Sequence, residues 1–374
     1  MPDTAGFDVR DLFTVSGRKI AAIYEKNKMT VHFQGMSKTL QFPQTAALQG
    51  APTCSIGVSP YGLYNRLNDA GRLILLNQKA VEFASAPFLC IGGKCTMLTQ
   101  RKPQLAEAPD DIPAIENYYH PAAAEKNVSL TIAPPSMEMA FQLGKIRVVR
   151  RLVSPFLSGG ETLIPVGVEE YEVSNASAEA QTVSLVVPKP SLVNLQEKEL
   201  KPTDQDSIYV STAALHGHDH KVFRSGGFQG VIMASSESTD RMGLAVPDLP
   251  GVAVDLQPYF CLNRLMQDLL LNEDGSFYEK REPVLRNDYG AAVSLTFTLE
   301  PKASIRIPVA VALDFPEQVY IDGAKFERKY VRQFPNKESR AVGMLQLALE
   351  RYPNWRQRTA DFQRSVYERI RKSP

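Results

Sequence analysis

Three short segments decide the fold of this sequence: Ile146-Arg-Val-Val-Arg-Arg-Leu-Val153, Ile164-Pro-Val-Gly-Val168 and Thr182-Val-Ser-Leu-Val-Val187. All three are rich in β-branched residues, and Pro and Gly separate the first from the second. In the third segment apolar residues stand at positions 183, 185 and 187, so one face of an extended chain is mainly apolar. This period of two predicts half-buried strands.

The same pattern recurs along most of the chain, where Gly and Pro separate short runs of β-branched and aromatic residues. We expect further strands at residues 18–24, 29–33, 81–89, 128–132, 222–233, 293–299 and 305–313. Short strands without intervening helices are typical of antiparallel sheets. The sequence therefore predicts a mainly β protein, a large antiparallel β-sandwich of two packed sheets.

The pattern changes after about residue 336. Apolar residues recur there at intervals of three and four, which predicts amphipathic helices. Pro353 interrupts the run, and Asn354 with Gln357 resembles a helix-start capping pair. We therefore expect a sandwich domain over residues 1–335 and two C-terminal helices within a basic segment over residues 336–374.

Charge separates the same two regions. The whole chain has 42 Lys and Arg against 41 Asp and Glu, a balance that excludes an acidic disordered protein and a uniformly basic nucleic-acid coat. From Lys325 onward there are 13 basic and 5 acidic residues, a net charge of +8, which leaves −7 for the first 324 residues. The basic end can bind an acidic partner, nucleic acid or the acidic sandwich itself. We prefer the last, with no nucleic-acid partner, because the two charges nearly cancel.

The cysteines and the N-terminus bear on location. The first residues do not have the basic start and apolar run of a signal peptide. The longest apolar run, Ile307–Leu313, is far shorter than the roughly 20 residues of a membrane span. Of four cysteines only Cys90 and Cys95 are close in sequence. We therefore expect reduced thiols, no membrane span and a cytoplasmic protein.

Several of these segments look familiar when they are taken together. They are Arg151-Leu-Val-Ser-Pro-Phe156, Ile164-Pro-Val-Gly-Val-Glu-Glu-Tyr-Glu-Val-Ser-Asn175, Gly290–Leu299, Asp314-Phe-Pro316 and Arg328-Lys-Tyr-Val-Arg332. They resemble the amino-terminal domain of glycoside hydrolase family 116, the family of bile acid β-glucosidase, also called non-lysosomal glucosylceramidase. The resemblance covers roughly residues 50 to 372.

The resemblance implies a β-sandwich that the family joins to an (α/α)6 domain, in which the nucleophilic Glu and the acid/base Asp lie. Only 54 residues follow position 320 here, whereas twelve helices of about 11 residues need well over 130. We therefore expect the catalytic domain to be absent from this sequence. The resemblance then assigns no catalytic residue to any position, and it implies no cofactor.

Aromatic side chains offer a route to sugar binding, because a ring can stack on the apolar face of a pyranose. The segment Tyr61-Gly-Leu-Tyr-Asn-Arg66 falls where the family has a glycine-rich turn. It makes Tyr61, Tyr64, Asn65 and Arg66 our candidate carbohydrate-binding residues. The alternative is that these aromatic residues are buried in the sandwich core.

Two other patterns suggest chemistry only weakly. His216, His218 and His220 share one face of an extended strand and could offer three imidazoles to zinc, but we prefer a solvated loop, because the segment is polar and contains Gly217. The carboxylates beside predicted strands are Glu169, Glu170, Asp288 and Asp314. For each of these carboxylates we prefer a surface or turn-capping role to the paired role that glycoside hydrolysis needs.

The sequence therefore predicts a non-catalytic, stand-alone relative of the family 116 sandwich. It would act by binding a glycan or by assembling with other chains, as a homo-oligomer or in a complex. The first alternative is an accessory subunit of a split β-glucosidase whose (α/α)6 domain is a separate chain. The second is an unrelated hydrolase within the sandwich.

Overall fold

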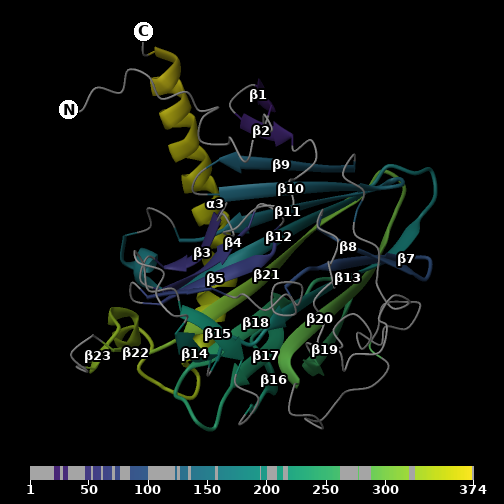
Figure 1. The fold of residues 1–374 in the computed structure, drawn as a ribbon. Coiled ribbons are helices and arrows are strands. Elements are labelled where there is room, and N and C mark those ends of the chain that lie inside the picture. The colour runs from purple at the N-terminus through teal and green to yellow at the C-terminus, as the bar shows by residue number, and fades with distance from the viewer. Residues whose placement is uncertain are drawn as a thin grey trace.

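The structure is a computed structural model of the 374-residue chain. It describes residues 21–25, 28–32, 47–51, 54–59, 62–69, 72–75, 85–99, 123, 127–133, 136–155, 159–193, 195–199, 209–213, 218–261, 277, 288–319 and 325–372. Most of these residues lie in strands, and one long helix stands near the C-terminus (Figure 1).

The largest sheet has ten strands, and every neighbouring pair in it is antiparallel. In spatial order they are β1 (Ala21–Glu25), β2 (Lys28–His32), β9 (Val128–Ala133), β10 (Ser136–Leu143), β11 (Ile146–Val153), β12 (Val166–Asn175), β21 (Ser304–Asp314), β18 (Arg241–Pro247), β17 (Phe228–Ala234) and β16 (Lys221–Ser225).

Two smaller sheets and a ribbon complete the strand structure. The five-stranded sheet contains, in order, β19 (Val252–Cys261), β20 (Asp288–Leu299), β13 (Gln181–Pro190), β7 (Phe88–Ile91) and β8 (Lys94–Met97). The six-stranded sheet contains β14 (Leu195–Glu199), β15 (Tyr209–Ala213), β6 (Arg72–Leu75), β5 (Tyr64–Asp69), β4 (Cys54–Val58) and β3 (Ala47–Ala51). The ribbon pairs β22 (Glu317–Val319) with β23 (Lys325–Glu327).

The prediction of a mainly β protein with antiparallel sheets is confirmed, but two details differ. The described strands form three large sheets rather than two, and β15 pairs with β6 in parallel. The segment expected as one strand at residues 222–233 is a hairpin, because Gly226 and Gly227 adopt positive φ and turn the chain. Alternation identifies the buried face of a strand, but it does not say which strand pairs with which.

The C-terminal helix α3 (Arg340–Lys372) is continuous through Pro353, so the prediction of two helices is wrong. Pro353 has no N–H to donate to the carbonyl of Leu349, a loss that breaks many helices. Ala348 and Trp355, on either side of it, are almost fully buried against the sheet. This packing holds the helix together across the proline, and Asn354 is an internal residue rather than a cap.

Helix α3 lies on one face of the ten-stranded sheet, and the smaller sheets pack on the other face (Figure 1). On β12, Val166 and Val168 belong to the apolar cluster under the helix, whereas Tyr171 and Val173 belong to the core between the sheets. Strand β18 lets the helix approach closely, since a Cβ atom at Gly243 would lie 2.6 Å from Leu345 Cδ1. Two 3-10 helices, η4 (Gly159–Leu163) and η5 (Lys329–Arg332), precede β12 and α3 respectively.

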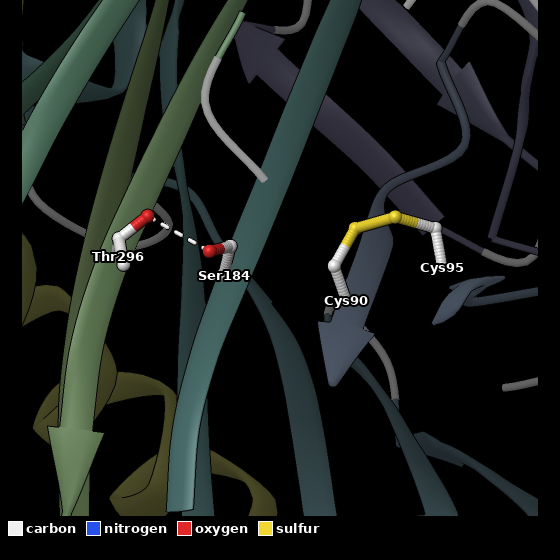
Figure 2. The surroundings of a disulfide bond; sticks show 4 residues. All are labelled: Cys90, Cys95, Ser184 and Thr296. Carbon is white, nitrogen blue, oxygen red and sulfur yellow. Dashed lines mark hydrogen bonds between the residues drawn. A yellow bond between two sulfur atoms is a disulfide. The ribbon is translucent and has the colours of Figure 1, made fainter. Parts of the chain in front are cut away.

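The hairpin of β7 and β8 carries a disulfide between Cys90 and Cys95, which contradicts the prediction of reduced thiols for this pair. The two residues are directly opposite each other in the antiparallel register, because Gly92 and Gly93 form the turn between them. Figure 2 shows the bridge beside Ser184, the partner of Cys90 on β13. A bridge across so short a loop contributes about 2 kcal/mol in the chain-entropy model.

Among the described residues, no helix is both long enough and apolar enough to span a membrane. This includes α3, whose 33 residues carry charged side chains along their length.

Candidate functional site

Glu169 is the centre of a buried charged cluster where the three large sheets meet. Its side chain is fully buried on β12, with Arg150 of β11 beside it and Lys189 of β13 opposite it. The Arg150 Nε atom donates to Glu169 Oε2 at 3.1 Å, and Arg150 Nη2 lies 3.0 Å from the same oxygen. The Lys189 Nζ atom donates to Glu169 Oε1 at 2.6 Å. One carboxylate therefore holds two cations.

Two tyrosines complete the coordination of this carboxylate. Tyr171 donates its hydroxyl to Glu169 Oε2 at 2.5 Å, and the Tyr64 hydroxyl of β5 lies 2.9 Å from Gln49 Oε1 and 3.3 Å from Glu169 Oε1. Lys189 Nζ also lies 4.7 Å from the centre of the Tyr64 ring, within cation–π range. The cluster thus links all three sheets through hydrogen bonds and ion pairs.

Arg150 also fixes a loop next to the cluster. Its Nη1 atom donates to the Gly62 carbonyl at 2.5 Å. Gly62 has a φ of 77°, and a Cβ atom there would lie 2.9 Å from Arg150 Nη1. Only glycine suits this position, because both the backbone conformation and the close approach of Arg150 exclude a side chain.

The cluster keeps Glu169 ionised. Burial opposes ionisation, but attraction by Arg150 and Lys189, together with their hydrogen bonds, lowers the pKa of Glu169 to about 2. Burial, and to a smaller extent repulsion by Arg150, lowers the pKa of Lys189 to about 8, because attraction by Glu169 only partly compensates. Burial and the neighbouring carboxylate raise the pKa values of Tyr64 and Tyr171. At neutral pH Glu169 is therefore a fixed anion.

Glu170 points to the opposite face of β12, as neighbours on a strand must. It accepts hydrogen bonds from Arg356 of α3 at 2.8 Å and from Arg151 at 3.1 Å. Arg151 also donates to Glu138 and Glu172. This network fastens the helix to the sheet, and it matches the preference for a basic end that binds its own sandwich.

Asp314 ties the end of β21 to the start of the helical segment. Tyr330 of η5 donates its hydroxyl to Asp314 Oδ1 at 3.0 Å, and Arg340 Nη1 lies 3.4 Å from the same oxygen. Burial raises the pKa of Asp314, because it outweighs the attraction of Arg340. Glu161 of η4 makes a comparable tie, since it accepts the indole N–H of Trp355 at 2.7 Å.

These contacts correct the surface role that we preferred for three of the carboxylates. Glu169, Glu170 and Asp314 are each at most 1% exposed, and all three have cationic partners. Asp288 begins β20, and its side chain lies outside the described part of the structure. A glycosidase pair needs two carboxylates that face one sugar, but Glu169 and Glu170 face opposite sides of a sheet.

The candidate carbohydrate-binding residues are placed only in part. Tyr64 is fully buried, so its ring belongs to the core, which was the alternative for the aromatic residues. Asn65 and Arg66 follow it on β5, and nothing is described of their side chains. Tyr61 lies outside the described residues.

The histidines are also placed in part, since His216 lies outside the described residues. The rings of His218 and His220 are 5.4 Å apart. His220 is buried, stacks on Tyr259 and lies 2.6 Å, through Nδ1, from the Pro258 carbonyl. Burial lowers its pKa to about 4. Within the described ranges, no three His, Cys, Asp or Glu side chains are arranged to hold a metal ion.

The sequence contained a signal for the Glu169 cluster that our prediction missed. Apolar residues at positions 146, 148 and 152 face the core of β11, and Arg150 falls in the same series. Lys189 falls in the series of Val183, Leu185 and Val187 on β13. Charged residues at core positions of neighbouring strands indicate buried ion pairs.

No curated protein matches the sequence. Among solved structures, "Putative kojibiose phosphorylase from human microbiome" is similar over 92% of this chain and 35% of its own, at 8% identity and a TM-score of 0.36. This chain therefore spans about a third of that protein's length. A galactose mutarotase related enzyme from Lactobacillus acidophilus is similar over 71% of this chain and 96% of its own, at 8% identity and a TM-score of 0.31.

The sequence does match a family model. Residues 99–355 match the model described as beta-glucosidase 2, glycosyl-hydrolase family 116 N-term. The match covers more than half of the chain and includes β11, β12, β13, β21 and the first half of α3. The chain therefore belongs to the glycosyl-hydrolase family 116 N-terminal family.

Proposed function

We propose that this chain is a non-catalytic module that acts by assembly with another chain. The observation that supports the proposal is that three buried carboxylates are already paired with cations. Glu169, Glu170 and Asp314 are all engaged by cations of the chain itself. A buried carboxylate held in this way has no free access to substrate. The module would therefore contribute a scaffold rather than a catalytic group.

Membership of this family suggests the kind of partner chain. The resemblance described above implies that the family joins this sandwich to an (α/α)6 domain. We therefore propose an (α/α)6 glycosidase chain as the preferred partner, which makes the module an accessory subunit of a β-glucosidase. Self-association into a homo-oligomer is the other form of assembly that we propose.

The test is to purify the tagged chain from its native host and to measure the mass of the complex by light scattering. The chain alone has a mass of 41.5 kDa. We expect a larger particle that contains a stoichiometric glycosidase of twelve helices, or a multiple of this chain. A monodisperse particle of the monomer mass, with no second chain, would contradict the proposal.

Carbohydrate binding at the segment 61–66 stays a second proposal. It is supported by the Arg150 contact to Gly62, which fixes the turn that follows Tyr61. The test is calorimetric titration with a β-glucoside for the wild type and Tyr61→Ala, with Tyr64→Phe as the control because Tyr64 is buried. We expect a loss of affinity in Tyr61→Ala alone. Equal affinity in all three proteins would rule out this site.

A further inference from the structure

The cross-strand disulfide lies at an exposed corner of the five-stranded sheet. Strand β8 is the edge strand in the described sheet, and the turn residues Gly92 and Gly93 are exposed. Cys95 on this edge is half-buried, whereas Cys90 is only 3% exposed. A thiolate from outside the protein can therefore approach Cys95 Sγ more readily than Cys90 Sγ.

The bridge is not needed to close the hairpin. Residues 91 and 94 are register partners, and the two glycines supply the positive φ angles that a two-residue hairpin turn requires. Cys90 and Cys95 are only five positions apart, so the bridge constrains a very short loop of the unfolded chain. Beyond it, Met97 and Leu98 are fully buried, and Leu98 N donates to the Pro87 carbonyl at 2.7 Å. The base of the hairpin is thus anchored without the disulfide.

The surroundings of Cys90 suit a reduced thiol as well as a disulfide. Its neighbour across β13 is Ser184, whose hydroxyl lies 2.8 Å from that of Thr296 (Figure 2). Cys90 itself belongs to the hydrophobic core cluster, and a buried free cysteine behaves as a small apolar side chain. The site therefore accommodates a reduced Cys90 as a neutral thiol.

From these observations we propose that Cys90–Cys95 is a reversible thiol–disulfide exchange site, whose bridge restrains local opening of edge strand β8 although the hairpin forms without it. A thiolate of a dithiol reductant attacks Cys95 Sγ, the Cys90–Cys95 bond breaks, and Cys90 leaves as a thiolate that takes up a proton. The second thiol of the reductant then attacks the mixed disulfide and releases Cys95. The dithiol is oxidised to its own disulfide and the protein gains two thiols. A small disulfide such as oxidised glutathione reverses the change.

The experiment uses the full chain and treats the oxidised protein with dithiothreitol in native buffer. Free thiols are then alkylated with N-ethylmaleimide and located by mass spectrometry of peptides. Cys54 is the internal control for unfolding, since it is fully buried in β4. We expect Cys90 and Cys95 to be alkylated at a rate at least about tenfold above that of Cys54. The amides of residues 93–96 should then exchange hydrogen about tenfold faster, while those of residues 183–187 stay protected.

Three outcomes would overturn the proposal. In the first, Cys90 and Cys95 react only together with Cys54, which would mean that reduction needs global unfolding and that the bridge is a structural one. In the second, both thiols stay free after treatment with oxidised glutathione, which would mean that no bridge forms. In the third, the bridge is reduced but amide exchange in β8 does not change. A Cys95→Ser variant, which cannot form the bridge, should reproduce the exchange pattern of the reduced protein.

Discussion

Glu169 is the residue on which the three sheets converge, so its replacement tests the cluster directly. In Glu169→Gln the cations of Arg150 and Lys189 lose the carboxylate that compensates them in a fully buried site. Breaking one partner of a buried pair in this way costs roughly 3–5 kcal/mol. We expect a loss of this size in the free energy of unfolding, measured by urea denaturation.

The matched control is Glu138→Gln, which removes a partner of Arg151 at a partly exposed site. We expect a loss of at most about 1 kcal/mol there, since solvent screens the charges. If the loss in Glu169→Gln were as small as the loss in Glu138→Gln, the Glu169 cluster would not stabilise the fold.

The lowered pKa of Glu169 predicts that the stability of the protein depends on pH. The pKa of Glu169 is about 2 in the folded protein against an ordinary value of 4.5. Between these two values the unfolded chain binds a proton that the native protein does not bind, so stability falls as the pH falls through this range. The full contribution, on the order of 3 kcal/mol, is present above about pH 4.5. Urea denaturation at about pH 5 and about pH 3 measures the part of this loss that falls between those two pH values, and Glu169→Gln should show a smaller loss.

For individual residues, the sequence identified the candidate carboxylates but not their surroundings. The carboxylates at 169, 170 and 314 were recognised as candidates, but their burial was missed because their cationic partners are distant in sequence. Arg150 is 19 residues from Glu169, and Arg356 is 186 residues from Glu170. Alternation placed Arg150 and Lys189 at core positions, and it could have predicted a buried ion pair. It could not have predicted which charges would meet.

Helix α3 differs from the prediction at Pro353, and the variant Asn354→Ala distinguishes the two descriptions. If a helix began at Asn354, loss of its capping side chain would cost about 1 kcal/mol. Within one continuous helix the exposed Asn354 has no such role, and we expect a change of no more than about 0.5 kcal/mol.

The companion variant Pro353→Ala should stabilise the protein, because it restores a backbone donor in the helix interior. Thermal denaturation followed by circular dichroism measures both variants. A destabilised Asn354→Ala, together with an unchanged Pro353→Ala, would indicate two helices.

The contact between α3 and β18 gives a second prediction at the scale of elements. Replacing Gly243 by Ala places a methyl group 2.6 Å from Leu345 Cδ1 and 3.2 Å from Ile232 Cδ1, so these side chains must move. Overpacking of this kind costs about 1–3 kcal/mol. Gly160→Ala is the control, since a Cβ atom there has no neighbour within 4 Å. Urea denaturation should separate the two variants, and equal stability would mean that the helix does not pack closely on β18.

The sequence predicted that this end of the chain is helical and basic, because those properties are local. It could not predict that the helix would continue past a proline. The burial of Ala348 and Trp355 against a sheet built from distant segments decides that outcome. Tertiary packing therefore overrides a local helix-breaking signal here.

For the whole molecule the sequence predicted the fold class and the family, and the structure added the arrangement. The strand-like segments at residues 146–153, 183–187 and 305–313 all lie in long buried strands. The three-sheet arrangement could not be predicted, because pairing between β13 and β20, or between β12 and β21, joins residues at least 100 positions apart. The Cys90–Cys95 bridge was missed for a different reason, since the preference for reduced thiols rested on expected location rather than on hairpin register.

The central claim is that Glu169, Glu170 and Asp314 hold the sheets and the helix together, and the proposal that rests on it is that the chain is non-catalytic. The most direct measurement is the hydrolysis of a chromogenic β-glucoside by the purified chain, with no other protein present. We predict that release of the chromophore equals that of the buffer blank at every concentration of the chain. Release that increases in proportion to the amount of chain, and that co-purifies with it through a second chromatographic step, would contradict the claim.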